Sequence, residues 1–251
     1  MRYLIISDIH ANLVALEAVL GVAEVQGFDE VWCLGDIVGY GPDPNECVAA
    51  VREVASIVLA GNHDWAALGK LDVSDFNPEA RQAVEWTQEQ LSDESRAYLE
   101  ELPPRLDQVA ELFTLAHGSP RHPIWEYIVY PSTAAENFDH FETPFCLVGH
   151  THQPVLFRRD PEDGAVQALM PALEYPLPLR RAAEQGVRLI INPGSVGQPR
   201  DGDPRASFAI YDAEAGTLSY YRVAYDVAET QARMRAAGLP ERLVARLEYG
   251  W

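Results

Sequence analysis

Aspartate, asparagine and histidine side chains recur in this chain directly after short apolar runs, mostly beside glycine. Seven of them are nitrogen or oxygen ligands of the kind that transition metals accept: Asp8, His10, Asp36, Asn62, His117, His150 and His152. A set without thiolate favours Mn²⁺, Fe, Zn²⁺, Co²⁺ or Ni²⁺ over Ca²⁺ or Mg²⁺. Gathering imidazoles and carboxylates around an empty space is unfavourable, because like charges repel and polar groups lose water. The pattern therefore predicts bound metal, and seven ligands suit two ions that share a carboxylate.

The spacing of these residues supports a metal site. Residues two apart in a strand, or in its immediate extension, face the same way. Asp8 and His10 could therefore bind one ion together, as could His150 and His152. A single histidine in such a turn is more often structural, but five of the seven histidines fall at predicted strand ends. These five are His10, His63, His117, His150 and His152.

The apolar runs themselves predict the elements that position the polar residues. They are rich in Val, Ile, Leu and Phe without alternation, which is typical of strands buried on both faces. Helices are predicted between several of them, at 13–24 and after the capping residues Asn77 and Ser92. Strands alternating with helices indicate a largely parallel sheet, whose ligands lie beyond the carboxyl ends of the strands. The runs are 3–6, 31–34, 57–59, 112–115, 145–148 and 189–191.

The pattern changes after His152. Turn residues separate two pairs of short apolar runs, which predicts hairpins over 155–169 and 206–223. The tail over 227–247 is predicted to be helical, with a break near Gly238 and Pro240. No linker or repeat interrupts the chain, so we expect a single domain over residues 1–251.

Composition and charge restrict the classes of partner. Apolar residues make up 47% of the 251 and charged residues 23%, a globular balance. No apolar run reaches the ~18 residues needed to cross a bilayer, and the N-terminus turns polar too soon for a secretory signal, so we expect a cytoplasmic protein. The net charge of −19 disfavours long nucleic acids and anionic membranes. A small phosphorylated molecule is the expected partner, and the sequence gives no indication of the oligomeric state.

The polar clusters, taken in order, resemble the five motifs of the calcineurin-like metallophosphoesterase superfamily. The resemblance runs from residue 8 to 152 and is strongest to its small bacterial and archaeal phosphodiesterase-like branch. It implies an α/β fold in which a β-sandwich of two sheets of mixed strands is flanked by helices. The motifs are Asp8-x-His10, Gly35-Asp36, Gly61-Asn62-His63-Asp64, His117 and Gly149-His150-x-His152.

The same resemblance implies a role for each residue. Two divalent ions, most typically Mn²⁺, would hold a bridging hydroxide that attacks the phosphorus. His63 would donate a proton to the leaving group. Asp64 would either orient His63 or serve as a cap or turn partner. The first ion would be bound by Asp8, His10, Asp36 and His152, and the second by Asn62, His117, His150 and the shared Asp36.

The chain departs from the phosphoprotein phosphatases of this superfamily. Those enzymes carry an Asp-Arg pair three residues after the bridging aspartate, where this chain has Gly39 and Tyr40. Arg121 and Arg200 are candidates to bind the substrate phosphate instead, although each can also be an ordinary loop arginine. Three aromatic residues could stack on a base or an aromatic leaving group, although packing in the core or in a lid is favoured for them: Trp65, Trp125 and Tyr127.

These features favour hydrolysis of a small phosphodiester, with a phosphomonoester as the less favoured substrate. Two alternatives remain open. One is a non-catalytic metal-binding scaffold on the same fold, against which the presence of His63 argues. The other is hydrolysis of a dinucleoside polyphosphate, which the missing Asp-Arg pair disfavours. The region 153–186 indicates neither a substrate nor a role.

Overall fold

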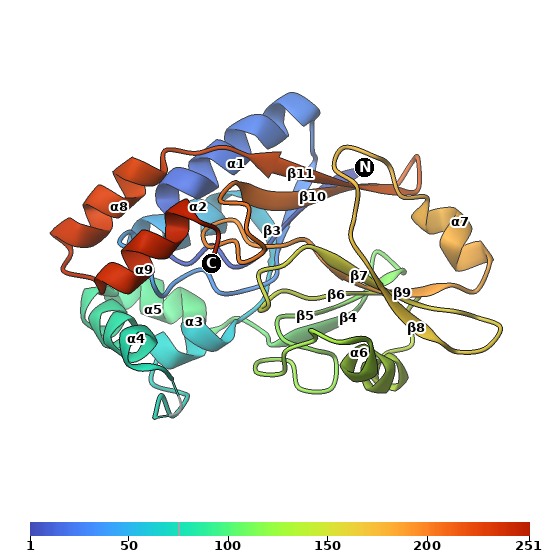
Figure 1. The fold of residues 1–251 in the computed structure, drawn as a ribbon, viewed down its shortest axis with the longest axis horizontal. Coiled ribbons are helices and arrows are strands. Elements are labelled where there is room, and N and C mark those ends of the chain that lie inside the picture. The colour runs from blue at the N-terminus through green and yellow to red at the C-terminus, as the bar shows by residue number, and fades with distance from the viewer. Residues whose placement is uncertain (75) are drawn as a thin grey trace.

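Two mixed β-sheets form the centre of the molecule in a computed structural model, which describes residues 1–74 and 76–251 (Figure 1). The first sheet has the order β11-β10-β1-β2-β3. Its strands are β1 (Arg2–Ile6), β2 (Glu30–Cys33), β3 (Ala55–Val58), β10 (Ala206–Asp212) and β11 (Thr217–Val223). The second has the order β4-β5-β6-β9-β7-β8. Its strands are β4 (Arg105–Val109), β5 (Phe113–Ala116), β6 (Phe145–Leu147), β7 (Val155–Arg159), β8 (Val166–Leu169) and β9 (Arg188–Asn192).

Each sheet combines a parallel part with antiparallel edges. Strands β1, β2 and β3 pair in parallel, as do β5, β6 and β9. The predicted hairpins are the antiparallel pairs β7–β8 and β10–β11. All six apolar runs form strands, but the sequence pattern alone predicted one largely parallel sheet, which is wrong. A run of apolar residues indicates that a strand is buried, but it does not indicate which sheet the strand joins. The two-sheet sandwich implied by the family resemblance is confirmed.

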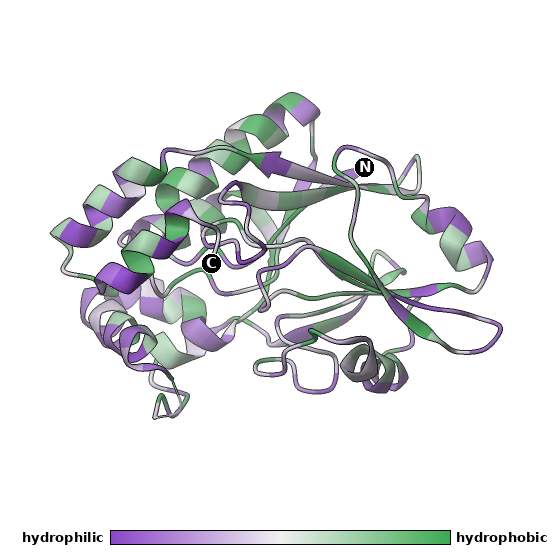
Figure 2. Ribbon diagram, in the orientation of Figure 1, coloured by the Kyte–Doolittle hydropathy of each residue, from purple (hydrophilic) through white to green (hydrophobic). Residues whose placement is uncertain are grey.

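The strands are buried on both faces because the sheets pack against each other and helices cover their outer sides. Along β1, Tyr3 and Ile5 face the core between the sheets, whereas Leu4 and Ile6 pack against the helical layer. Trp32 of β2 extends the inner core, with its ring 4.3 Å from that of Tyr3. In Figure 2 the strands are mainly hydrophobic and the helices show mixed faces, as a layered sandwich requires.

Helices around the two sheets complete the fold. The helices are α1 (Leu13–Gln26), α2 (Pro44–Val54), α3 (Asn62–Ala67), α4 (Pro78–Gln90), α5 (Asp93–Glu100), α6 (Pro131–Asn137), α7 (Leu179–Glu184), α8 (Val227–Ala236) and α9 (Glu241–Ala245). The capping predictions are confirmed, since the side chains of Asn77 and Ser92 accept the N–H groups that begin α4 and α5. Among the described residues, no helix is long and apolar enough to cross a membrane.

The carboxyl ends of the parallel strands in the two sheets meet at one place. The loop after β1 is tied to the loop after β2, because the Asp8 N–H donates to the Gly35 carbonyl at 3.0 Å. In the second sheet, the Gly149 N–H after β6 donates to the His117 carbonyl after β5 at 2.8 Å. The His150 N–H then reaches across to the Asp8 carboxylate at 3.1 Å. The sandwich therefore brings motifs that are far apart in sequence to a common edge.

Candidate metal centre

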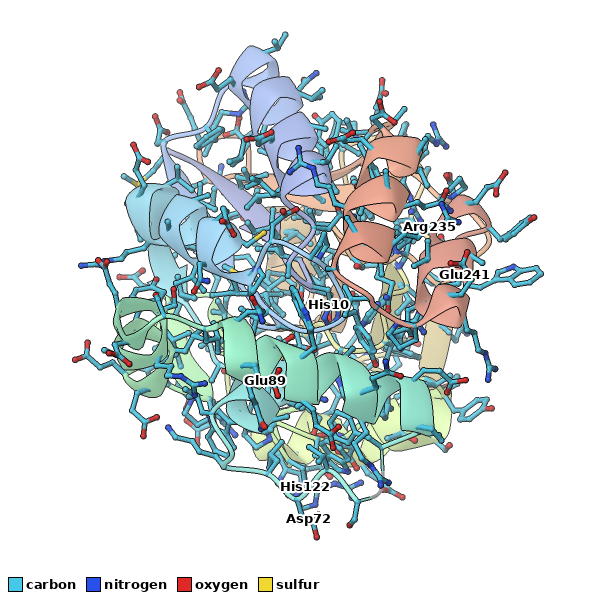
Figure 3. The ribbon with its side chains drawn as sticks, turned by 90° about the vertical axis from the view of Figure 1, so that its left-hand side faces the viewer. His10, Asp72, Glu89, His122, Arg235 and Glu241 are labelled. Atoms are coloured by element: carbon cyan, nitrogen blue, oxygen red, sulfur yellow. The ribbon has the colours of Figure 1, made fainter. Side chains whose placement is uncertain are left out.

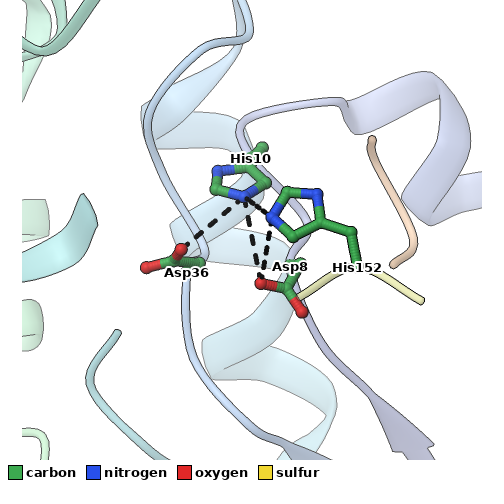
Figure 4. A group of neighbouring side chains, drawn as sticks. All are labelled: Asp8, His10, Asp36 and His152. Atoms are coloured by element: carbon green, nitrogen blue, oxygen red, sulfur yellow. Dashed lines mark hydrogen bonds and ion pairs between the residues drawn. The ribbon is translucent and has the colours of Figure 1, made fainter. Parts of the chain in front are cut away.

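Two groups of buried side chains at this edge have the geometry to hold a metal ion each, and Asp36 belongs to both. In each group the candidate ligand atoms lie within 4.8 Å of one another. The first group is Asp8, His10, Asp36 and His152 (Figure 4). The second is Asp36, His117 and His150, and the Asn62 Oδ1 atom lies 3.2 Å from His117 Nε2. The structure thus brings all seven predicted ligands together, divided as the family resemblance implied.

The local backbone that presents these ligands differs from the strand extension predicted from their spacing. Asp8, His10, Asp36, His150 and His152 all have positive φ, between 50° and 64°. Left-handed backbone costs a residue other than glycine about 1–3 kcal/mol, and such strain gathers at functional sites. The prediction that His150 and His152 could bind the same ion is wrong, because the turn between them sends His152 to the first group and His150 to the second.

Backbone carbonyls set the orientation of the histidine rings. The Nδ1 atoms of His10, His117 and His152 lie 3.2, 2.9 and 2.6 Å from the carbonyl oxygens of Val38, Leu34 and Gln198, respectively. A carbonyl can only accept, so each Nδ1 carries the proton. His150 is reversed, because its Nε2 donates to the Trp125 carbonyl at 3.2 Å. Each ring therefore turns its other nitrogen toward the cluster, which is how protein metal sites fix their imidazole ligands.

The pair His10 and His152 shows that the first group fits a cation. Their Nε2 atoms are 3.0 Å apart, and both Nδ1 atoms already hold the ring proton. Burial lowers the pKa of both imidazoles well below the usual value, so both are neutral. Two nitrogen lone pairs then face each other at hydrogen-bonding distance with no proton between them. A divalent cation bound to both removes that repulsion.

The Asp36 carboxylate is suited to be shared. Its Oδ1 accepts the backbone N–H of His63 at 2.8 Å. Its buried Oδ2 has no hydrogen-bond partner among the described residues. That Oδ2 lies 3.6 Å from His10 Nε2 and 3.3 Å from His117 Nε2, and so between the two groups. Burial alone would raise the pKa of Asp36, but the His117 ring beside it lowers that pKa, so the group is ionised.

The other two site carboxylates differ from Asp36 in their surroundings. Burial raises the pKa of Asp8 to about 6 and that of Asp64 to about 7. Asp64 accepts four backbone N–H groups, from Gly61, Asp36, Ile37 and Val38, at 2.8–3.1 Å. Both of its oxygens are therefore used to join the β2 loop to the start of α3. Of the two roles considered for Asp64, this arrangement is that of a turn partner.

His63 lies beside the ligand cluster and outside both ligand groups. Its ring is edge-on to His10, at a centroid distance of 5.0 Å, and packs against Tyr40 at 4.2 Å. A Cβ atom on Gly39 would lie 2.7 Å from His63 Nδ1, so only glycine leaves room for the ring there. The Nδ1 atom is buried and has no hydrogen-bond partner among the described residues. His63 thus retains a free polar atom at the edge of the cluster.

The two arginines proposed as substrate contacts have different environments. Arg121 pairs with Glu126 and, at 2.8 Å, with Glu136. Its charge is already neutralised, so the structure favours the ordinary loop arginine for this position. Arg200 lies near the cluster, because its backbone N–H donates to the backbone carbonyl of His152 at 3.4 Å. His122, not predicted as a ligand, is exposed at the edge of the molecule, whereas His10 lies in its middle (Figure 3).

Sequence analysis missed several residues that hold the ligand loops in place. Ser195 donates to the Asp8 carbonyl at 2.7 Å, and Asn192 donates to the Gly149 carbonyl at 2.6 Å. Gln198 contributes its own carbonyl to His152. Polar residues do follow the apolar run 189–191 in the sequence. No spacing rule, however, predicts that they contact the loop of Asp8, almost two hundred positions earlier.

Aromatic residues line the cluster near His150. The Tyr127 ring stacks on the His150 ring at a centroid distance of 3.7 Å, and Trp125 lies 5.6 Å from Phe76. Tyr127 is 49% exposed and Trp125 45%, so neither is a core residue. Trp125 is therefore only partly covered by its neighbours, and the exposed part of its ring is free to contact a ligand.

Replacing Gly149 with alanine tests the packing of the cluster. The added Cβ would lie 2.1 Å from Ser7 Oγ and 2.9 Å from Asp8 Oδ2, so Asp8 must move. We expect Gly149→Ala to weaken Mn²⁺ binding by at least about tenfold in titrations against a competing chelator, because a ligand carboxylate is displaced. Gly21→Ala is the control, since nothing lies within 4 Å of its new Cβ. Equal affinity of Gly149→Ala and the native chain would contradict this account of the cluster.

Comparisons with known proteins agree with this geometry. A crystal structure of a metallophosphoesterase from Sphaerobacter thermophilus matches with 53% identity and a TM-score of 0.88, over 100% of this chain and 99% of that one. A hypothetical protein from Pyrococcus horikoshii shares the fold, with 22% identity and a TM-score of 0.76 over 100% and 98% of the two chains. An uncharacterized protein of Methanocaldococcus jannaschii is 36% identical over 98% of this chain and 97% of its own length. The model of the calcineurin-like phosphoesterase superfamily domain matches residues 1–216, and the chain belongs to that superfamily.

Proposed function

We propose that this protein hydrolyses a small phosphodiester with two divalent metal ions bound at the cluster. The observation that carries the proposal is the division of seven buried ligands into two groups that share Asp36. Membership of a phosphoesterase superfamily supports a phosphoric ester hydrolase, and the lone pairs of His10 and His152 support bound cations.

The residues of the chain have separable tasks in this reaction. Two ions bound at the cluster would activate a water molecule and neutralise charge that develops on the phosphoryl oxygens. Asp36 holds the two groups at a fixed separation, and Asp64 fixes the loop of Asp36. The buried rings exclude bulk water, so electrostatic interactions with the phosphoryl group are stronger than at the surface.

His63 is placed to act on the leaving group. Burial lowers the pKa of His63 to about 4, so the imidazole is neutral at pH 7 before substrate binds. An anionic phosphoryl group next to the ring would raise that pKa, because it favours the charged imidazolium. The buried Nδ1 has no partner among the described residues, and His63 would use a ring nitrogen to donate a proton to the departing oxygen.

The surroundings of His63 favour a small diester over a phosphoprotein. The positions of the Asp-Arg pair of phosphoprotein phosphatases are occupied by Gly39 and Tyr40, and both pack directly on the His63 ring. The leaving group of a phosphoric ester departs as an alkoxide or aryloxide that needs a proton, and a planar leaving group also gains from a stacking surface. His63 offers the first, and the exposed rings of Trp125 and Tyr127 offer the second.

Replacing His63 with asparagine tests the proton donor. We expect His63→Asn to lower kcat for a diester by about 10²–10⁴-fold, the usual contribution of a general acid, while metal content by elemental analysis stays unchanged. His122→Asn is the matched control, since His122 is exposed and outside the cluster. Full activity of His63→Asn at full metal content would eliminate the assigned role.

The reaction class itself is tested by metal removal and restoration. Chelator-stripped protein should not hydrolyse bis(p-nitrophenyl) phosphate or p-nitrophenyl phosphate, and Mn²⁺ should restore turnover with a preference for the diester. A monoester preference would refute the proposed substrate class. Lack of activity with Mn²⁺, Fe, Co²⁺, Ni²⁺ and Zn²⁺ would instead favour the non-catalytic scaffold.

A further inference from the structure

Two arginines lie together beside the metal cluster without an acidic partner. The side chains of Arg200 and Arg246 both donate to the same neutral acceptor, Gln198 Oε1, at 2.7 and 2.5 Å. Among the described residues, no carboxylate lies within ion-pair distance of either guanidinium. The buried Nε atoms of both side chains also lack a hydrogen-bond partner in that part of the chain. Two like charges thus share one amide oxygen.

The arginine pair is close to the reacting centre on the side of His63. The guanidinium carbon of Arg246 is 4.6 Å from the centre of the Tyr40 ring, and that of Arg200 is 5.7 Å from it. The Tyr40 ring also packs against the His63 ring, at 4.2 Å, and against the ring of the candidate ligand His10, at 4.8 Å. Gln198 links the pair to the cluster as well, because its carbonyl holds the His152 ring. The Tyr40 ring therefore lies between the two arginines and His63, the residue proposed to protonate the leaving oxygen.

Arg246 comes from a part of the chain outside the family domain. The superfamily match ends at residue 216, whereas Arg246 follows α9 directly. That segment is fixed over the site, since Leu243 and Leu247 pack in one cluster with Tyr40. In Figure 1 the C-terminal end lies beside the loops at the centre of the molecule. The C-terminal segment thus places a second positive charge next to Arg200, which belongs to the family domain.

We propose that Arg200 and Arg246 form a subsite that binds a second phosphoryl group of the substrate, next to the one that is cleaved. The inference rests on the proposed phosphoesterase function and specifies its substrate class. Guanidinium groups bind phosphate oxygens through paired, charge-assisted hydrogen bonds, and a phosphoryl dianion relieves the repulsion between two neighbouring cations. Ions held by the ligand cluster would neutralise the scissile group, so the two arginines remain available for a second anionic group.

The electrostatics of the pair agree with this assignment. Burial, together with the charge of Arg200, lowers the pKa of Arg246 to about 10. Arg246 still carries its charge at neutral pH. In a chain with a net charge of −19, a region that concentrates uncompensated positive charge beside a metal cluster would also attract anions to the site.

The test compares binding of one and two phosphoryl groups without turnover. Calorimetric titration of Mn²⁺-loaded protein would use methylphosphonate and methylenediphosphonate, with metal content checked before and after. The native chain should bind the diphosphonate more tightly. Arg246→Gln and Arg200→Gln should each lose about 10- to 100-fold of diphosphonate affinity, the effect of removing a charge-assisted partner, and leave methylphosphonate binding unchanged.

Two further variants and two contrary outcomes separate this role from a structural one. Arg242→Gln is the matched control, because Arg242 is exposed on α9 and pairs only with Glu79 among the described residues, at 3.5 Å. Arg246→Lys keeps the charge and should retain part of the affinity. A lower Tm of Arg246→Gln with unchanged diphosphonate affinity would overturn the subsite. So would a native chain that binds both phosphonates equally, even if the enzyme hydrolyses simple diesters.

Discussion

The structure depends on an ionised carboxylate, Asp36, one of whose buried oxygens has no hydrogen-bond partner in the described part of the chain. Its Oδ2 lies between the histidines of two ligand groups. Buried charge of this kind is unfavourable unless it is compensated, and the facing lone pairs of His10 and His152 increase the cost. A cation bound beside Asp36 would resolve both problems. The buried Asp and His side chains of the cluster therefore have the arrangement expected of a metal site.

The rest of the fold serves that arrangement. Parallel strands in two sheets end at one edge, and left-handed turns, instead of regular strand extensions, direct the ligands inward. Other residues stabilise those turns, because Asp64 accepts three backbone N–H groups of the β2 loop and one from Gly61, and Ser195 holds the loop of Asp8. A packed sandwich of two hydrophobic layers offsets the strain stored at its edge.

The sequence was informative where a local pattern determines structure. Apolar runs predicted the strands, Asn77 and Ser92 marked helix starts, and the motif residues from Asp8 to His152 come together at one edge. It was uninformative where the determinant is a contact between distant residues. No spacing showed that the runs divide into two sheets, or that His150 and His152 belong to different groups. Gln198 and Arg246 are placed beside the cluster by the packing of the β9–β10 loop and the C-terminal helices. Such packing produces no recognisable motif in the sequence.

The most direct test of a shared Asp36 is anomalous X-ray diffraction from crystals of the Mn²⁺-loaded protein. The account predicts two manganese peaks per chain, one beside Asp8, His10 and His152 and the other beside Asn62, His117 and His150. Both should contact the Asp36 carboxylate. A single peak, or two peaks of which only one touches Asp36, would contradict the central claim.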